Sequence, residues 1–551
     1  MAEKLKIISL GGLNEIGKNM TVLEYGDDIL LVDCGLSFPD DDMYGVDIVI
    51  PDITYLIRNK NRIRAIAITH GHEDHIGSIP YVVREVDAPI YATRLTVGLM
   101  ELKLQEHGLL KKAHIVPLEA GDTFTAGCFK VEFIHTNHSI ADSVALAITT
   151  PLGIVIHTGD FKIDTTPIEG GMIDIARFAE LGKEGVLALM SDSTNVEKPG
   201  YSVSESRVGD NLEAFFDYDG RIIVTTFASN VHRIQQVINC AHKYGRKVGI
   251  TGRSMENTLR VAQELGYLNI PDNTMVDMNR IRNIPHDKIV IITTGSQGET
   301  MSALYRIAFS DHKQIEITAG DRVIISASAI PGNEKMVGRV INELFRRGAE
   351  VIYDRNIGLH ASGHACKEEL RMMIALTKPK FFIPVHGEQR HLKLHADLAK
   401  QMGIPQNNII VGNIGTVIEL SKKHIRTNGV VPAGQILVDG SGVGDVGSVV
   451  LRDRKHLAQD GMVVAVVGIS STDGSITSGP DIITRGFVYV KESEELINDL
   501  KHKVTDAVYD CQWRNITDWA AIKGVIKGSL SEYLYKHTRR TPMILPVVME
   551  T

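Results

Sequence analysis

The segment "AIAITHGHEDHIGSIPYV", residues 65–82, gathers metal-binding residue types directly after an apolar run. It places His70, His72, Asp74 and His75 within six residues. Ionisable groups held at the edge of a core cost free energy unless something compensates them, and a cation is the usual compensator. Neutral imidazole nitrogens and carboxylate oxygens are ligands that zinc, manganese or iron prefer. A chance H-x-H of surface histidines explains this density less well, so we predict a metal site.

A site for two metals needs more ligands than one loop supplies, so further ligands are expected where other apolar strands end. "FIHTNHSIADS" offers His138, with His135 as a less favoured neighbour. "IVIHTGDFK" offers Asp160, with His157 as a competitor, and "FFIPVHGE" offers His386. Each alone is equally well explained as a core or surface residue. Together, acids and imidazoles at the ends of several apolar strands predict one shared site.

The elements that would position these residues follow two patterns. Residues 1 to about 205 alternate short apolar strands with turns, which predicts a sandwich of sheets covered by helices. From about 210 to 355 the pattern is strand, loop, helix, which favours a parallel sheet. Its strands end in small polar residues before helices, where backbone N–H groups could receive phosphate, although ordinary helix capping explains any single loop as well. Residues 356–430 are again strand-rich, and residues beyond about 450 predict a small α+β domain.

Length and composition describe an ordinary globular protein. The 551 residues suggest about three domains, with 43% hydrophobic and 23% charged residues. A net charge of −8 argues against a passive, basic nucleic-acid coat, but not against a local basic channel. Five scattered cysteines without C-x-x-C predict no disulfide framework. "MAEKLKIISL" lacks the apolar core of a signal peptide and no membrane-length apolar run occurs, so we expect a cytoplasmic protein with no membrane partner.

One motif resembles a phosphate loop without being one. "GLNEIGKN", Gly12 to Asn19, nearly fits G-x-x-x-x-G-K-[ST], but Asn19 stands where the magnesium-binding hydroxyl belongs. The next segment, "MTVLEYG", is predicted as a strand, whereas a phosphate loop must open a helix. The sequence therefore argues against a nucleotide triphosphatase.

Several motifs carry a family resemblance. H-x-H-x-D-H, a later strand-end histidine and "HTGD" resemble the metallo-β-lactamase fold, and "SDSTN", "HASGH" and "PVHGE" resemble its β-CASP branch, whose members cut nucleic acids. "GGLNEIGKNM", "PDDDMYGVDIVIPD" and "THGHEDHIG" are similar to the bacterial ribonuclease J family, over essentially the whole chain. The resemblance implies an α/β fold: a metallo-β-lactamase αββα sandwich with an inserted β-CASP α/β domain and a small C-terminal α+β domain that helps dimers or tetramers form.

The pattern and the resemblance together place the domain boundaries. We expect the first part of the metallo-β-lactamase domain at 1–208 and the β-CASP domain at 209–358. The second part of the metallo-β-lactamase domain, with β-CASP motifs at its start, is expected at 359–430, followed by a Gly-rich linker at 431–449. The C-terminal oligomerisation domain is expected at 450–551.

The resemblance also assigns metal ligands and catalytic residues. The implied ligands of two Zn²⁺ ions, with Mn²⁺ or Mg²⁺ as alternatives, are His70, His72 and His138 for the first, Asp74, His75 and His386 for the second, and Asp160 between them. Asp33 would orient the ligands, the alternative being a strand-end turn aspartate. Asp192 and His364 match the two β-CASP signature positions and are the candidate catalytic residues; a helix cap and a surface histidine are the alternatives.

Two further sets are implied only by the resemblance. The expected contacts to substrate phosphates are Ser229, Asn230, Val231, His360, Ala361, Ser362, Gly363 and His364. A structural Ca²⁺ would be held by Gly45 through its carbonyl, Asp47 and Asp439, since hard oxygen ligands suit that ion. A solvated acidic loop explains the aspartates near residue 47 equally well.

The function implied by the resemblance is that of a two-metal ribonuclease acting on single-stranded RNA. It would have 5′-to-3′ exonuclease activity favouring 5′-monophosphorylated RNA and additional endonuclease activity, in mRNA decay and rRNA maturation. We expect a homodimer or homotetramer, with a paralogous subunit and an RNA-degradation complex as further partners. The alternatives are another metallo-β-lactamase hydrolase, for tRNA 3′ ends or thioesters, and a non-catalytic subunit of a degradation complex. "HASGH" and "PVHGE" weigh against the first alternative, and the complete ligand set weighs against the second.

Overall fold

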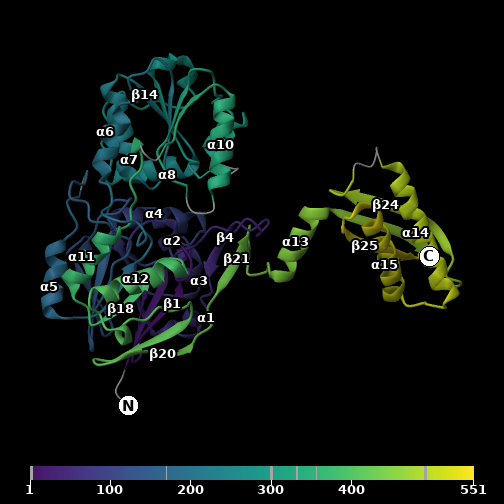
Figure 1. Ribbon diagram of the computed structural model, residues 1–551, viewed down its shortest axis with the longest axis horizontal. Helices are drawn as coiled ribbons and strands as arrows, with labels where there is room; N and C mark the ends of the chain where they lie inside the picture. Colours follow the sequence, from purple (N-terminus) through teal and green to yellow (C-terminus); the bar gives the residue numbers. More distant parts are fainter. Residues whose placement is uncertain (1–3, 169, 298–301, 330–332, 355–356, 489–492) are drawn as a thin grey trace. The chain divides into compact units, whose positions relative to one another are not determined.

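The structure is a computed structural model that describes residues 4–551 except 169, 298–301, 330–332, 355–356 and 489–492 (Figure 1). The chain divides into two compact units. The first consists of Met1–Ser37 with Ile50–Ile436, and the second of Phe38–Val49 with Leu437–Thr551.

An eight-stranded sheet forms one half of the sandwich in the first unit, in the order β20-β19-β1-β2-β3-β5-β6-β7. Its strands are β1 (Leu5–Gly11), β2 (Met20–Tyr25), β3 (Asp28–Val32), β5 (Ile63–Ala67), β6 (Ile90–Thr93), β7 (Ile115–Leu118), β19 (Thr416–Leu420) and β20 (Ile425–Val430). Pairing is antiparallel from β20 to β3 and parallel from β3 to β7. Because β3 and β5 are parallel, the residues that follow them lie at one edge of the sheet.

A six-stranded sheet forms the other half, in the order β18-β12-β11-β10-β9-β8. Its strands are β8 (Thr123–Ala126), β9 (Phe129–His135), β10 (Val144–Thr150), β11 (Gly153–His157), β12 (Val186–Asp192) and β18 (Phe381–Val385). The strands β11, β12 and β18 are parallel, while β8 to β11 pair antiparallel. The segments that follow the three parallel strands therefore share one edge, as in the first sheet.

Period-two alternation of the strands explains the layers of this sandwich. Ile7 belongs to the core between the two sheets, together with Phe133 and Phe381, whereas its neighbour Ile8 belongs to the core under the helices. The helices of this domain are α1 (Thr54–Arg58), α2 (Glu73–Ile76), α3 (Ile79–Glu85), α4 (Arg94–Glu106), α5 (Ile175–Glu184), α11 (Lys367–Thr377) and α12 (Gln389–Gln401). Helices α3 and α4 pack on the first sheet and α5, α11 and α12 on the second. The predicted αββα sandwich is confirmed.

A separate five-stranded parallel sheet lies between the two parts of the sandwich in the sequence. Its order is β14-β15-β13-β16-β17, with β13 (Ile222–Thr225), β14 (Lys247–Thr251), β15 (Ile289–Thr293), β16 (Arg322–Ile325) and β17 (Glu350–Ile352). Its helices are α6 (Glu205–Glu213), α7 (Val231–Lys243), α8 (Arg253–Glu264), α9 (Ala303–Ala308) and α10 (Glu334–Arg346). The strand-loop-helix pattern of the sequence thus gives the parallel sheet that it predicts.

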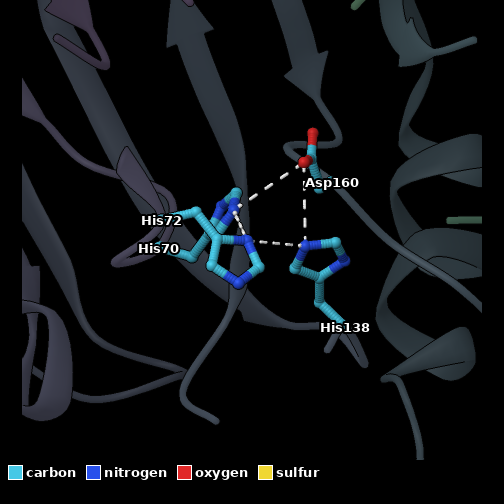
Figure 2. A group of neighbouring side chains, drawn as sticks. All are labelled: His70, His72, His138 and Asp160. Atoms are coloured by element: carbon cyan, nitrogen blue, oxygen red, sulfur yellow. Dashed lines mark hydrogen bonds and ion pairs between the residues drawn. The ribbon is translucent and has the colours of Figure 1, made fainter. Parts of the chain in front are cut away.

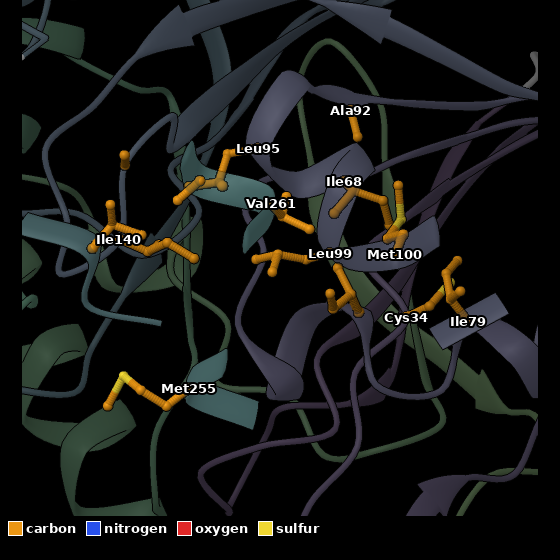
Figure 3. Close-up of a cluster of buried hydrophobic side chains, with 14 of the residues drawn as sticks. Cys34, Ile68, Ile79, Ala92, Leu95, Leu99, Met100, Ile140, Met255 and Val261 are labelled. Atoms are coloured by element: carbon orange, nitrogen blue, oxygen red, sulfur yellow. The ribbon is translucent and has the colours of Figure 1, made fainter. Parts of the chain in front are cut away.

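This inserted domain packs directly on the sandwich through α4 and α8 (Figure 3). Leu99 of α4 and Met255 and Val261 of α8 belong to one buried cluster. A Cβ atom on Gly98 would lie 2.5 Å from Cγ1 of Val261, so the helices approach as closely as they do because residue 98 is glycine. The buried apolar junction holds the two domains of the first unit together.

The second unit contains a three-stranded sheet covered on one face by two long helices. The sheet order is β24-β23-β25, with β23 (Met462–Ile469), β24 (Ile476–Arg485) and β25 (Met543–Glu550). The core is formed with α14 (Glu494–Trp513) and α15 (Trp519–Thr538), which gives the expected α+β domain. The segment predicted as a linker holds β21 (Gln435–Asp439), β22 (Gly442–Val443) and the start of α13 (Ser448–Asp460), and β4 (Ile48–Pro51) pairs with β21. None of the described helices has both the length and the apolar character needed to cross a bilayer.

Candidate metal centre

The seven side chains predicted as metal ligands lie in one cluster, although they come from distant parts of the chain. Two of the three groups whose ligand atoms lie within 4.8 Å of one another contain them: His70, His72, His138 and Asp160, and Asp74, His75, Asp160 and His386; the third group joins Asp160 and His386 to Asp192 and His364. Asp160 belongs to all three groups. We call His70, His72 and His138 the first half-site, and Asp74, His75 and His386 the second half-site.

The sheet edges explain this convergence. His70 follows β5, Asp160 follows β11 and His386 follows β18 directly, all at the carboxyl ends of parallel strands. The backbone of His386 is left-handed, with φ of 54°, which a non-glycine residue adopts only when its surroundings hold it. Its N–H donates to the Gly12 carbonyl at 3.0 Å, which is one such constraint.

The first half-site consists of two buried imidazoles, those of His70 and His138, and the half-buried imidazole of His72, and their ring nitrogens face one another (Figure 2). Nδ1 of His72 lies 3.1 Å from Nε2 of His70 and 3.0 Å from Nε2 of His138. Burial lowers the pKa of all three imidazoles, that of His72 to about 4. His138 Nδ1 lies 2.7 Å from the Gly363 carbonyl, so it donates there and leaves Nε2 free as a ligand. Neutral nitrogens facing one point fit a cation.

The second half-site combines imidazoles with carboxylates. Oδ2 of Asp74 lies 3.2 Å from Nε2 of His386, and Oδ2 of Asp160 lies 3.3 Å from Nε2 of His75. Burial opposes protonation of His75 and His386, but the carboxylates, Asp160 foremost, raise the pKa of both well above the usual value. Buried Oδ1 of Asp160 accepts no hydrogen bond from the described residues. A divalent cation would neutralise these carboxylates in place of protons, so the donor set fits one.

Asp33 lies behind the second half-site, at the end of β3. Its Oδ2 is 2.8 Å from Nδ1 of His75, and its Oδ1 accepts a hydrogen bond from the backbone N–H of Thr69 at 2.8 Å. The carboxylate therefore holds the proton of His75 on Nδ1 and turns Nε2 toward the cluster. Its φ of 60° places this buried aspartate in the left-handed region, so its surroundings hold its position.

Asp192 and His364, the candidate catalytic residues, form an ion pair beside the cluster. Nδ1 of His364 lies 2.8 Å from Oδ2 of Asp192 and 3.9 Å from Oδ2 of Asp160. Burial disfavours the charged imidazole, but these two carboxylates outweigh it and raise the pKa of His364. Thr194 donates its N–H and its hydroxyl to Oδ1 of Asp192, which fixes that carboxylate. The pair can hold a proton next to the cluster.

The predicted substrate contacts lie in two segments that one buried arginine connects. Asn230 caps α7 by accepting the N–H of Arg233, so ordinary capping accounts for that side chain. The Arg233 guanidinium donates to the Leu359 carbonyl at 2.7 Å and pairs with Glu205. The start of α7, with Ser229 and Val231, is thereby joined to the segment that carries His360 and Ala361.

The segment from His360 to His364 has its own constraints. Ser362 accepts a hydrogen bond from Asn195 Nδ2 at 2.7 Å, and a Cβ atom on Gly363 would lie 2.6 Å from the His138 ring. Burial, followed by the charge of Arg233, lowers the pKa of His360 to about 4. Because no larger residue fits at position 363, the backbone can approach the first half-site closely.

The two competing histidines lie outside the ligand groups. His135 Nε2 lies 3.1 Å from the Gly171 carbonyl. Nδ1 of His157 accepts the N–H of Gly159 at 3.1 Å, and burial lowers its pKa to about 4. Asp160 rather than His157 therefore faces the ligands, a choice that the sequence left open.

The second unit contains the residues expected to bind calcium. Oδ2 of Asp47 accepts the N–H of Gly440 at 2.7 Å, and Oδ2 of Asp439 pairs with Arg454 at 2.6 Å. The same guanidinium donates to the Tyr44 carbonyl and lies against Gly45. The guanidinium of Arg454 thus occupies the position expected for calcium. Calcium binding by these residues remains a prediction, and it requires Arg454 to move.

The sequence prediction missed three residues that organise the centre. Asn19 lies 3.3 Å from the Asp74 carboxylate, Arg233 joins the substrate segments, and Glu369 accepts the N–H groups of Ile163 and Cys366 at 2.7 Å. Glu369 lies in the first turn of α11, where an acidic residue is ordinary, so it carried no signal. Only Asn19 lay in a segment that the sequence singled out, as the false phosphate loop.

Four protein-family models match the chain in consecutive segments. They are "Metallo-beta-lactamase superfamily" at 13–175, "Ribonuclease J, beta-CASP domain" at 219–344, "Zn-dependent metallo-hydrolase RNA specificity domain" at 350–411 and "Ribonuclease J C-terminal domain" at 449–551. The first and third models cover the two parts of the sandwich. The second covers the inserted parallel sheet, and the fourth covers the C-terminal α+β domain.

Several curated relatives match along nearly the whole chain. The chain is 45% identical to "Ribonuclease J" of Synechocystis sp., over 98% of its own length and 86% of the relative's. It is 42% identical to "Ribonuclease J2" of Bacillus subtilis, over 100% and 99%. It is 43% identical to "Ribonuclease J 1" of Streptococcus pyogenes serotype M3, over 98% and 97%.

A solved structure supports the fold alone. A protein of unknown function from Enterococcus faecalis V583 is similar with a TM-score of 0.53 and 16% identity, over 76% of this chain and 100% of that one. The consecutive domain models and the relatives at 42–45% identity across nearly the whole chain agree on one family. The chain belongs to the ribonuclease J family of metallo-β-lactamase hydrolases.

Proposed function

We propose that the protein hydrolyses RNA phosphodiester bonds with two divalent cations, Zn²⁺ or Mn²⁺, with Mg²⁺ as an alternative. The observation that carries the proposal is the convergence of two ligand groups on one shared aspartate, Asp160, beside the adjoining acid–base pair of His364 and Asp192. Paired metals a few ångströms apart are typical of phosphodiester hydrolases. Membership of the ribonuclease J family supports RNA as the substrate.

The first half-site would hold one cation, the second half-site the other, and Asp160 would contribute to both. Imidazole nitrogens and carboxylate oxygens suit zinc and manganese better than calcium. When bound, such cations make water reactive at neutral pH and offset the negative charge of the phosphate. The Gly363 carbonyl and Asp33 would keep the imidazoles of His138 and His75 in the ligating tautomer.

His364 and Asp192 would manage the proton of the leaving group. Despite burial, the carboxylates of Asp192 and Asp160 raise the pKa of His364, which favours the protonated imidazole, and Asp192 accepts from Nδ1 at 2.8 Å. We propose that the imidazolium of His364 donates its Nε2 proton to the departing 3′-oxygen, while Asp192 orients the ring by accepting from Nδ1. General acid catalysis of this kind contributes about 10²–10⁴-fold to a rate.

The 5′-to-3′ direction of cleavage would be set by the two segments that are candidates for contacting phosphate, the start of α7 and residues 359–364. We propose 5′-to-3′ exonuclease action that favours a 5′-monophosphate, with endonuclease action where RNA can enter without a free end. Support comes from the start of α7, a helix of thirteen residues whose N-terminal N–H groups suit an anion. The buried Arg233 holds that helix start next to the segment 359–364. Binding through phosphate and sugar gives little dependence on base sequence.

The test compares RNAs that differ only at the 5′ end. Purified protein is incubated with Mn²⁺ and with 5′-monophosphorylated, 5′-triphosphorylated and 5′-hydroxyl forms of one internally labelled RNA. Release of single nucleotides from the monophosphorylated form, with slower internal cuts in the others, is expected. Turnover of a small thioester without RNA decay, or trimming from the 3′ end, would contradict the proposal. Fully metallated protein without any hydrolysis would favour a non-catalytic subunit.

We also propose a homodimer or homotetramer assembled through the C-terminal domain. Its sheet packs helices on one face, while Ile483 of β24 and Leu545 and Met549 of β25 remain exposed. Exposed apolar side chains gathered on one small domain are typical of an association surface. Light scattering of the full chain and of a Leu545→Lys variant tests this; a monomeric wild-type chain would contradict it.

A further inference from the structure

The loop between β1 and β2, residues 12–19, supports the backbone of the second half-site. Its Gly12 carbonyl accepts the N–H of His386 at 3.0 Å. The N–H of Asn19 donates to the Asp74 carbonyl at 2.9 Å, and the Asn19 carbonyl accepts the N–H of Gly35 at 2.9 Å. The segment that mimics a phosphate loop in sequence thus lies beneath the predicted ligands instead.

The side chain of Asn19 faces the same ligands. Its Nδ2 lies 3.3 Å from Oδ2 of Asp74 and 3.1 Å from Nε2 of His75, and the residue is 9% exposed. The same Asp74 oxygen is 3.2 Å from Nε2 of His386. An amide nitrogen donates hydrogen bonds and has no lone pair for a metal, so it orients ligand atoms rather than binding a cation.

Ordinary turn stabilisation does not explain this placement. Asn14, on the same loop, does what a turn asparagine usually does: it has a left-handed φ of 63° and pairs with Asn413 at the exposed surface. Asn19 is instead buried in a crowded place, since a Cβ atom on Gly35 would lie 1.6 Å from the Asp74 carbonyl and 2.7 Å from the Asn19 nitrogen. The second of these distances concerns the backbone nitrogen of Asn19. The side-chain amide is crowded as well, since a Cβ atom on Gly12 would lie 2.3 Å from Oδ1 of Asn19, which leaves the amide few other positions.

We propose that Asn19 is a positioning residue for the second half-site, which it serves by donating a hydrogen bond to the Asp74 carboxylate. It holds Oδ2 of Asp74 toward His75 and His386 and contributes nothing comparable to the first half-site. The proposal rests on the proposed function in one respect, namely that the two half-sites take one cation each. Hydrogen-bond partners of metal ligands typically contribute about 10–100-fold to metal affinity.

The test measures metal binding directly. Protein stripped with a chelator is titrated with Mn²⁺, and the free ion is followed by electron paramagnetic resonance. Asn19→Ala should weaken the second equivalent about 10–100-fold and leave the first unchanged. The matched control, Asn14→Ala on the same loop, should titrate like the wild type. Thermal unfolding of each variant is recorded in parallel.

A second variant separates the hydrogen bond from packing. Asn19→Leu keeps the approximate volume of the side chain but removes the donor, so it should weaken the second equivalent as much as alanine does. Restoration of tight binding by leucine would assign the effect to packing and overturn the proposal. Wild-type affinity in the alanine variant, or equal loss of both equivalents in both variants, would overturn it too. A wild-type chain that binds fewer than two equivalents would instead contradict the proposed function.

Discussion

The two half-sites share Asp160 but are built on opposite electrostatic principles. In the first, burial lowers the pKa of three imidazoles, and their ring nitrogens face one another with no carboxylate other than Asp160 in the ligand group. In the second, carboxylates overcome burial and raise the pKa of both imidazoles. The first half-site therefore presents neutral ligands, whereas the second exchanges protons for a cation.

The surroundings differ in the same sense. The first half-site has a backbone carbonyl, that of Gly363, to orient His138, and the Thr69 hydroxyl lies 3.1 Å from Nδ1 of His70. The second is surrounded by side chains that donate to or accept from its ligands, among them Asp33 and Thr194. Orientation by side chains can be altered by mutation without removing a ligand. The second half-site has more such contacts, from Asn19, Asp33 and Thr194, so it offers more positions at which affinity can be changed in steps.

Loss of a ligand from the first half-site should have the largest effect. His72→Ala removes the nitrogen on which His70 and His138 converge. We expect the first cation to be lost and RNA hydrolysis to fall by about a thousandfold or more, because a catalytic cation supplies several kcal/mol of charge stabilisation. Elemental analysis and single-turnover rates on 5′-labelled RNA measure both. His135→Ala, outside the ligand groups, is the control, and full metal content in His72→Ala would refute the assignment.

Loss of the acid–base pair should slow cleavage without removing metal. His364→Ala leaves all seven predicted ligands in place, so two equivalents of metal should remain while the single-turnover rate falls by about 10²–10⁴-fold. Loss of the second cation in this variant would contradict the assignment of ligands to the second half-site, because His364 would then act as a ligand. RNA with a better leaving group than a 3′-alkoxide should recover much of the rate; no recovery would argue against a proton donor.

Loss of an orienting carboxylate should affect only the second half-site. Asp33→Asn preserves shape but weakens the hydrogen bond to Nδ1 of His75. We expect affinity for the second cation to fall about 10–100-fold and the first to bind as before. Asp28→Asn, at the other end of the same strand and in a surface ion pair with Arg64, is the matched control. An equal fall in the affinities for both cations would show that the two half-sites are not independent.

Part of the cluster in both half-sites could be predicted because His70, His138, Asp160 and His386 lie within three residues of the end of an apolar strand. His70, Asp160 and His386 are polar residues at the ends of runs that must be buried, and parallel strands bring such ends to one edge. The residue pattern alone left Asp160 and His157 as competitors at the end of the same strand, and only the family resemblance assigned Asp160 before the structure. The arrangement of sheets and the α+β domain also followed from periodicity.

The orienting residues had no comparable signal. Asn19 contacts Asp74 across 55 positions of sequence, and Glu369 holds Ile163 across 206. Their amides and carboxylates are ordinary loop and helix residues until the fold brings a partner to them. Local pattern predicts what an element is and where it ends, whereas a hydrogen bond between distant loops depends on the packing of the whole domain.

The smallest expected effect concerns a buried histidine outside the metal cluster. It tests whether burial alone, without metal binding, lowers the pKa of an imidazole. His395 of α12 is fully buried behind Asp192, with Nδ1 3.0 Å from the Ser193 hydroxyl, and belongs to no ligand group. Burial lowers its pKa to about 3, in the same direction as in the first half-site. Below about pH 6.5 the unfolded chain takes up a proton that the folded protein refuses, so the stability present above that pH is lost progressively as pH falls toward about 3.

Replacing this residue should therefore reduce the acid sensitivity of folding. Between about pH 7.5 and 5.5, His395→Gln should lose about 1.5 kcal/mol less unfolding free energy than the wild type, measured from urea midpoints. Proton competition for the metal ligands is common to both proteins, so their difference isolates His395. The same substitution at the exposed His502 of α14 is the matched surface control. Identical acid sensitivity in His395→Gln and the wild type would mean that burial alone does not keep imidazoles neutral here, and the same argument would then fail for the imidazoles of the first half-site.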